Sequence, residues 1–288
     1  MLHRPGAAAN ILLDPLLIYV CGLGARGAAI ATVISQGLSA VWVLRFLTGP
    51  KTELRLVVRG FRPDWACIRR ITALGTSSFV MSFTDSLVQV ACNATLRTFG
   101  GDLYISVMTV INSVRQIAQT PVMALTDGAS PVISYNYGAR NVPRVRKAIR
   151  FMTQLGFGYT MLIWGLISLF PSAFIMIFNH EPDLLAAAVP SLHIYFFGFV
   201  MMAFQFSGQS VFKSLNKAKM AIFFSLLRKA FIVVPLTLLL PHVAGLGVNG
   251  VFLAEPISNF IGGLACYITM RCTVMPELKA MEIQEAAR

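Results

Sequence analysis

The chain has 288 residues, of which 56% are hydrophobic and 12% are charged, and its mean hydropathy is +0.69. About 25% of the residues of a typical soluble domain are charged, so this composition excludes such a domain and predicts an all-α, polytopic membrane protein. The formal net charge of +12 would suit nucleic-acid binding only if the basic residues formed one patch. They lie instead in short clusters between apolar segments, without interleaved aromatic residues that would stack on bases. No nucleic-acid partner is therefore expected.

Eight apolar segments are long enough to cross a bilayer as helices, for which about 20 residues are needed. They cover residues 5–21, 27–47, 68–92, 103–125, 151–178, 189–212, 221–240 and 248–270. The first segment begins almost at Met1, without the pattern of a cleavable signal peptide. The five cysteines are scattered and contain no CxxC pair, so neither a disulfide framework nor a zinc site is predicted. We expect about eight transmembrane helices.

Basic residues cluster in segments 48–70, 139–150 and 213–229, and further basic residues follow residue 270. The connections on the opposite side carry few charges, and the one at 179–183 is acidic. Positive charge is retained on the cytoplasmic side of a membrane. We therefore predict a multi-pass protein of the cell's inner or plasma membrane with both termini in the cytoplasm. The basic clusters are expected to contact anionic lipid headgroups.

An internal repeat links two turns of the chain. The segment GLGARGAAIATVISQ at 22–36 aligns with GLGVNGVFLAEPISN at 245–259, and both precede or begin a predicted span on the same side of the membrane. Such repeats are common in secondary transporters, whose substrate site lies between the halves. Both copies also match GxGxxG, but a dinucleotide site would need a preceding strand. A tight turn between two spans explains these glycines better.

Polar residues recur at helical spacing on three predicted spans, which places each set on one helix face. The candidate cation- or substrate-binding residues are Asp85, Gln89 and Asn93 on the third span, Asn112, Arg115 and Gln116 on the fourth, and Gln205 and Gln209 on the sixth. Polar side chains are costly in hydrocarbon, so these faces should point at a neighbouring helix or a water-filled cavity. They predict a transport pathway. No Ser/His/Asp, Cys/His or HExxH arrangement supports an enzyme, and no cofactor is expected.

The acidic residues within apolar segments have two interpretations. Asp85 is either the partner of a basic side chain such as Arg115 on the next span, or a proton or cation site that attracts a cationic substrate. Both hold if Arg115 moves away during a transport cycle. For Asp14 and Glu255, which each precede a proline, we favour a structural role, because proline frees backbone groups that neighbours must satisfy.

These segments resemble one family of membrane transporters. The run NILLDPLLIYVCGLGARGAAIATVISQ resembles the fifth and sixth helices of multidrug and toxic compound extrusion (MATE) transporters. The runs TDSLVQVACNATLRTFGGDLYISVMTVINSVRQI, PVISYNYGAR, FQFSGQSVFKSLNKAKMAIFFSLLRK and GVNGVFLAEPISN resemble helices seven to twelve of bacterial members. The resemblance covers nearly the whole chain and implies a fold of twelve helices in two lobes around a central cavity.

The resemblance also implies a division of the chain. Residues 1–50 would be the last two helices of the first lobe, 51–67 a cytoplasmic linker, 68–270 the second, six-helix lobe and 271–288 a cytoplasmic tail. About four preceding helices would be missing, and with them the aspartate that couples transport to ion flow in the first lobe. The acid that some members carry in the tenth helix is also missing, since segment 199–211 contains no carboxylate.

The activity implied is antiport by alternating access, in which small cationic compounds leave the cell while H⁺ or Na⁺ enters. Asp85 falls where many members place an acidic residue that binds cation or substrate, so a Na⁺ site near Asp85 is one expectation. The full-length transporter is expected to be a monomer in contact with membrane lipids. Two alternatives remain. A lipid-linked oligosaccharide flippase of the same superfamily would need several basic residues for a diphosphate, and only Arg115 lies deep in a predicted span. A truncated, non-transporting membrane protein is the other.

Overall fold

The computed structural model describes residues 4–49, 64–243 and 245–286, and the regular structure in these ranges is entirely helical. The predicted all-α chain is therefore confirmed over these ranges. The chain divides into two compact units, Met1–Ile68 and Arg69–Arg288, each described by itself below. The assignment of these parts to two transporter lobes stays a prediction.

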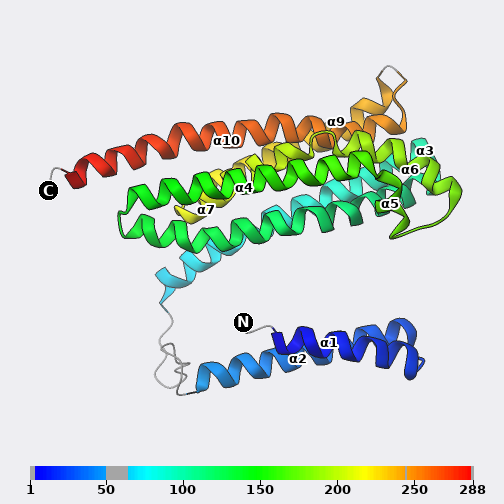
Figure 1. The fold of residues 1–288 in the computed structure, drawn as a ribbon, viewed down its shortest axis with the longest axis horizontal. Helices are drawn as coiled ribbons and strands as arrows, with labels where there is room; N and C mark the ends of the chain where they lie inside the picture. The colour runs from blue at the N-terminus through cyan, green and yellow to red at the C-terminus, as the bar shows by residue number, and fades with distance from the viewer. Residues whose placement is uncertain (1–3, 50–63, 244, 287–288) are drawn as a thin grey trace. The chain divides into compact units, whose positions relative to one another are not determined.

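The first unit is a helical hairpin (Figure 1). Helix α1 (Arg4–Pro15) continues through a π turn, η1 (Leu16–Val20), and α2 (Gly24–Thr48) packs back along α1. The two helices touch at Gly6, where an added Cβ would lie 1.7 Å from the Ser39 hydroxyl oxygen. Small residues allow membrane helices to approach closely without a large apolar interface.

The second unit begins with α3 (Trp65–Gly138). This element consists of two helices that meet at Gly101, where φ is 67° and ψ is −164°. Only glycine adopts this conformation readily. The further α-helices are α4 (Val142–Leu169), α5 (Pro171–Met176), α6 (Pro182–Phe196), α7 (Met202–Ser214), α8 (Ala218–Leu226), α9 (Val234–Leu239) and α10 (Val248–Ala286). Short 3-10 and π segments join them: η2 (Phe199–Met201), η3 (Leu227–Val233) and η4 (Leu240–His242).

Two predicted spans differ from the observed helices. The span at 151–178 is interrupted at Phe170, because the residue before Pro171 is driven out of the helical region, and its helix begins earlier, at Val142. The span at 189–212 is bent by 42° between α6 and α7. The 3-10 turn η2 lies at this bend and directs α7 along α10.

Four helices in the described ranges are long and apolar enough to cross a membrane: Gly24–Thr48, Val142–Leu169, Ala218–His242 and Val248–Glu285. A fifth is added if α6 and α7 count as one broken span, and Gly6–Val20 is a shorter apolar helix. The two halves of α3 are helical, as predicted, but do not reach this hydropathy. The polar residues on the faces of α3 lower its mean hydropathy.

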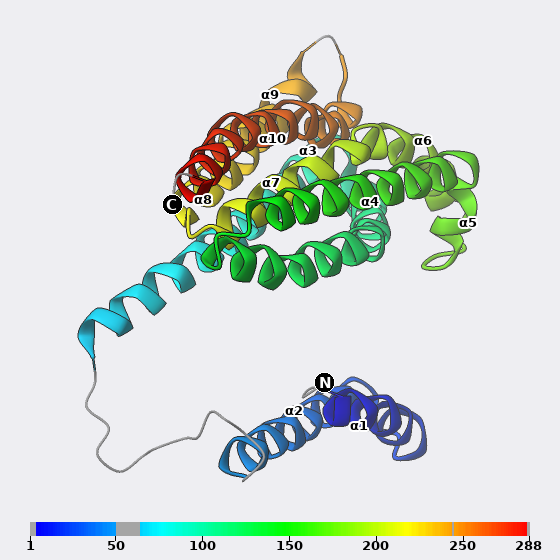
Figure 2. The same cartoon turned by 60° about the vertical axis from the view of Figure 1, so that its left-hand side comes forward.

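Helix α10 holds the core of the second unit together. Phe252 belongs to a buried apolar cluster shared with α3 and α6, and Met270 belongs to another shared with α4, α7 and α8. Figures 1 and 2 show α10 running beside α7 and α4. An added Cβ at Gly263 would lie 2.7 Å from the carbonyl oxygen of Met201. Backbone contact at such small residues fixes the position of α10.

The internal repeat has the same backbone geometry in both copies. The glycines of the two turns have positive φ, 64° and 52° at Gly22 and Gly24, and 70° and 49° at Gly245 and Gly247. After each turn a glycine touches the end of the preceding helix, Gly27 against the backbone of Leu17 and Gly250 against that of Leu240. These pairs are offset by the same number of residues as the aligned sequences. The predicted turn is confirmed as the reason for the GxGxxG pattern.

One end of the second unit is fastened by a charged cluster. The Tyr137 hydroxyl at the end of α3 donates to Glu277 Oε1 at 2.7 Å, and Lys217, before α8, pairs with the other carboxylate oxygen of Glu277. This hydrogen bond and partial burial raise the pKa of Tyr137 to about 12, so the phenol stays a donor. The cluster joins α3, the α7–α8 turn and α10.

Gly198, in the bend after α6, tests the packing against α10. An added Cβ there would lie 2.7 Å from Pro256 Cα and 2.8 Å from its carbonyl oxygen. We predict that Gly198→Ala destabilises the protein by about 1–3 kcal/mol, as overpacking does. The measurement is the temperature at which the detergent-purified, full-length protein loses its monodisperse chromatography peak. Gly158→Ala in α4 is the control, because nothing lies within 4 Å of its Cβ position. Equal temperatures for the two variants would contradict the prediction.

Candidate functional site

A charged cavity of about 310 Å³ lies inside the second unit. Its wall is formed by both halves of α3, by α7 and by the π turn η3. Six charged residues line it: Asp85, Arg115, Asp127, Lys213, Arg228 and Lys229. A smaller cavity of about 20 Å³ adjoins it and shares four of them, Asp85, Arg115, Arg228 and Lys229. Charged groups of both signs thus converge inside the bundle.

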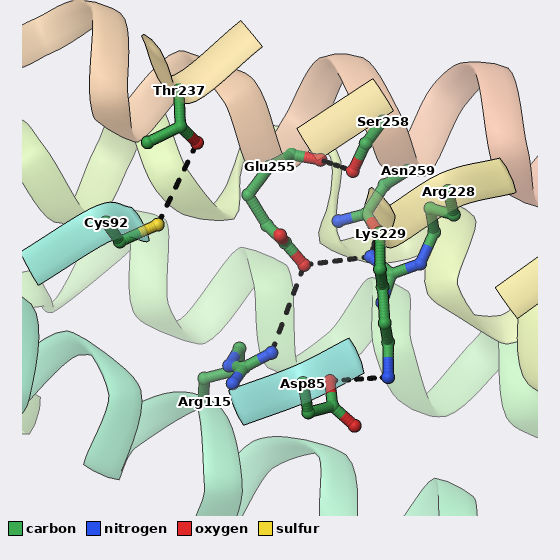
Figure 3. Close-up of polar contacts among 9 residues, drawn as sticks. All are labelled: Asp85, Cys92, Arg115, Arg228, Lys229, Thr237, Glu255, Ser258 and Asn259. Carbon is green, nitrogen blue, oxygen red and sulfur yellow. Dashed lines mark hydrogen bonds and ion pairs between the residues drawn. The ribbon is translucent and has the colours of Figure 1, made fainter. Parts of the chain in front are cut away.

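The centre of the site is a buried ion pair between α10 and η3 (Figure 3). Arg228 Nη1 donates to Glu255 Oε1 at 2.9 Å and to Asn259 Oδ1 at 2.8 Å. Both charged side chains are less than a tenth exposed. The aliphatic stem of Arg228 lies against Gly262, where a larger residue would collide with it. An unpaired charge is costly at such a position, so the Arg228–Glu255 pair holds η3 against α10. A structural role for Glu255 stays a prediction.

Arg115 approaches the same carboxylate from α3. Its Nη1 lies 4.0 Å from Glu255 Oε1, and its Nε has no hydrogen-bond partner among the described residues. The sequence suggested Arg115 as the partner of Asp85. In the structure Arg115 is instead paired with Glu255, and the partner of Asp85 is Lys229.

Asp85 and Lys229 point toward each other (Figure 3), and both line the larger cavity. The Lys229 side chain is 14% exposed, whereas that of Asp85 is 56% exposed. The ammonium group therefore occupies one side of a carboxylate that remains open on the other. A cation that enters the cavity meets a carboxylate already bound to a competing positive charge.

The π turn η3 places Arg228 and Lys229 in these two roles. It lies within the helical run from Ala218 to His242 and ends two residues before Pro235. Proline cannot donate a helical hydrogen bond, and π turns recur at functional sites. Here consecutive side chains reach Glu255 on α10 and Asp85 on α3. The sequence placed Arg228 and Lys229 both in the basic cluster 213–229 and in the apolar segment 221–240, and in the structure they lie in the helical run, with Arg228 buried and Lys229 largely covered.

The predicted glutamines of α7 line the larger cavity. Gln205 is 4% exposed and Gln209 is 7% exposed. Neither the amide nitrogen nor the amide oxygen of Gln205 has a hydrogen-bond partner within the ranges that the structure describes. A buried amide that is left unpaired is costly, so Gln205 offers a donor and an acceptor to a molecule in the cavity.

The other predicted site residues do not lie together. Gln89 and Asn112 line the smaller cavity, and the amide nitrogen of Asn112 lacks a partner. Asn93 and Gln116 line neither cavity. Within the described ranges no group of three or more His, Cys, Asp or Glu side chains could hold a metal ion. A Na⁺ site near Asp85 stays a prediction.

Sequence reasoning did not assign several residues to the site, namely Asp127, Lys213, Arg228, Lys229 and Asn259, and it favoured a structural role for Glu255. The sequence contains a pattern that could have identified one pair of these residues. Arg228 and Glu255 are opposite charges in two apolar segments, and such residues pair with each other inside membrane bundles.

The fold and the site define a class: a helical membrane protein with a charged internal cavity. The sequence profile of the MatE family matches residues 77–239, and the chain belongs to this family, as its motifs indicated. It is 20% identical over 277 residues to "Multidrug export protein MepA" of Staphylococcus haemolyticus, covering 96% of this chain and 61% of the relative. It is 22% identical over 274 residues to the "FAD transporter" of Shewanella oneidensis, covering 93% and 59%.

The same fold occurs in solved structures. One of them, described as the outward-facing conformation of a multidrug resistance MATE family transporter of the MOP superfamily, matches with a TM-score of 0.86 at 21% identity. The match covers 96% of this chain and 61% of that one. The chain therefore spans about three fifths of the length of the proteins that it matches.

The buried ion pair yields a stability prediction. Glu255→Gln leaves the Arg228 charge buried without its counterion, and we expect it to destabilise the protein by about 3–5 kcal/mol. The double variant Arg228→Met/Glu255→Met removes both charges and should recover most of that loss. Thermal unfolding of the purified protein in detergent measures both effects. Glu285→Gln, at the exposed end of α10, is the control. A single variant as stable as this control would contradict the prediction.

Proposed function

We propose that this chain forms part of a secondary antiporter that exports small cationic drugs or xenobiotics in exchange for H⁺ or Na⁺. The observation that carries the proposal is the half-exposed Asp85 carboxylate, held by Lys229 at the wall of a cavity inside a membrane bundle. Ionisable residues at such positions mark substrate and ion pathways. The family match and the relatives named as exporters support the same function.

Competition for Asp85 would provide the exchange. A cationic substrate at the open side of Asp85 weakens the hold of Lys229, and a proton or Na⁺ that binds the carboxylate weakens its hold on the substrate. The cationic substrate and the coupling ion would therefore compete for the Asp85 carboxylate, and binding of one weakens binding of the other. Gln205 and Gln209 would contribute hydrogen bonds to the substrate. Alternating access of the cavity to the two sides of the membrane completes the cycle.

The setting of the transporter is part of the proposal. The protein would act in the cell's inner or plasma membrane as a monomer, with both termini in the cytoplasm and lipids as its surroundings. It would need no cofactor beyond the coupling ion and would have no enzymatic activity. The basic segment 139–150 and the basic residues after residue 270 support this orientation.

Asp85→Asn tests the role of the carboxylate. Loss of a charge-assisted contact of about 1.5–3 kcal/mol should lower the apparent affinity for a fluorescent cationic dye by roughly ten- to a hundred-fold. Dye efflux from vesicles that contain the full-length protein measures this loss. Asp102→Asn, an exposed acid of the same helix that lines neither cavity, is the control. Undiminished efflux in Asp85→Asn would exclude the proposed role.

A second candidate function has specific support. Four basic residues and two acidic ones line the larger cavity, and one relative is named an FAD transporter. The observation that weighed against a lipid-linked oligosaccharide flippase, a single deep basic residue, does not hold, since Arg228 and Lys229 are also buried. A substrate with a diphosphate group would bind these side chains through charge-assisted hydrogen bonds.

Lys229→Met decides between the two functions. If the substrate is cationic, removing the competitor of Asp85 should tighten the binding of a cationic dye by about ten-fold, which corresponds to about 1.4 kcal/mol. If the substrate is a diphosphate, the variant should instead weaken the binding of a soluble nucleoside diphosphate. Equilibrium binding to the purified full-length protein measures both. Lys219→Met, an exposed lysine outside the cavities, should change neither affinity.

A further inference from the structure

A second basic concavity lies on the other side of α10 from the charged cluster of Tyr137, Lys217 and Glu277. This groove, of about 730 Å³, is formed by the first turns of α4 and the last turns of α10. Its charged residues are Arg146 and Arg150 on α4, and Arg271 and Lys279 on α10. Figures 1 and 2 show the two helices side by side over this length. The groove shares no residue with the cavities at Asp85.

The charges of the groove are mostly uncompensated. Arg146 forms an ion pair of 3.0 Å with Glu282 at the edge of the groove. Arg150, Arg271 and Lys279 have no ion-pair partner among the described residues. No acidic side chain lines the groove. Three positive charges that face one concavity favour a ligand with negative charge.

The groove crosses the boundary between charged and apolar sequence on both helices. In α4 no charged residue follows Arg150 before the helix ends, and in α10 none lies between Glu255 and Arg271. Tyr267 lies one turn deeper than Arg271, on the apolar side, and Met275 also lines the groove. Basic residues at the rim and an aromatic ring below them are typical of the interface between headgroups and hydrocarbon.

We propose that this groove binds the headgroup of an anionic phospholipid. The phosphodiester would lie between Arg150 and Arg271, whose guanidinium groups hold phosphate oxygens in a planar fork. The acyl chains would follow α4 and α10 past Tyr267 into the hydrocarbon. This site differs from general attraction of basic segments to the membrane surface, because it is a defined concavity. It requires only that the second unit spans a membrane and does not depend on the proposed transport.

The test compares two double variants of the full-length protein. Arg150→Gln/Arg271→Gln removes two charges from the groove, and Arg144→Gln/Lys147→Gln removes two exposed charges of α4 that do not line it. Native mass spectrometry in detergent measures bound phosphatidylglycerol and, for comparison, phosphatidylcholine. With about 1 kcal/mol for each basic residue near an anionic lipid, we expect the groove variant to bind phosphatidylglycerol about thirty-fold more weakly. The control variant should bind it as the natural protein does.

Three outcomes would overturn the proposal: no loss in the groove variant, an equal loss in both variants, or equal retention of the two lipids by the natural protein. Soluble glycerol 1-phosphate separates a lipid site from a site for free phosphate esters, and its binding as tightly as phosphatidylglycerol would also overturn the lipid assignment. If the groove variant does not fold, Lys279→Gln replaces it, with Lys147→Gln as control. The expected loss is then about five-fold.

Discussion

The ion pair between Arg228 and Glu255 is the constraint around which the interior of the second unit is arranged, because among the ion pairs of the described residues it alone has both side chains less than a tenth exposed. Both charged side chains are less than a tenth exposed, and either charge without its partner would be strongly destabilising there. The two side chains must therefore stay in contact. The pair therefore sets how η3 and α10 face each other. Two further residues of α10 hold Arg228 in place. Asn259 accepts a hydrogen bond from its guanidinium group, and Gly262 leaves space for its aliphatic stem.

Beside this enclosed pair lies a more exposed one. Since Arg228 is committed to α10, the neighbouring Lys229 reaches across to Asp85 on α3. The two pairs differ in exposure: Glu255 is enclosed, whereas more than half of Asp85 is open to the cavity. Rearrangement of the open pair costs less, because water or a ligand can replace either partner. An enclosed carboxylate and a half-exposed one thus lie within one network.

Much of this fold follows from sequence patterns, but the pairing of charges does not. Hydropathy and glycine positions predicted the helices, the repeated turns and the polar face of α3, because these depend on local properties of the chain. The sequence suggested Arg115 as one example of a basic partner for Asp85, whereas the structure pairs Asp85 with Lys229 and Arg115 with Glu255. These pairings depend on how α3, η3 and α10 pack together, which local patterns do not specify. The π turn η3 places Lys229, which belongs both to the basic cluster 213–229 and to the apolar segment 221–240, at the cavity wall. The sequence alone does not distinguish a surface position from a position at the cavity wall for a basic residue at the end of a basic cluster.

The same helix, α10, carries both kinds of charged site because its two ends lie in different surroundings. Glu255 lies in an apolar segment, where a charge must be neutralised within the protein. Arg271 and Lys279 follow that segment, where positive charge can be left unpaired in the structure and neutralised by lipid. Glu277, between them, faces Lys217 and Tyr137 on the opposite side. The carboxylate of Glu277 is therefore engaged away from Arg271 and Lys279, which keep their positive charge in the groove.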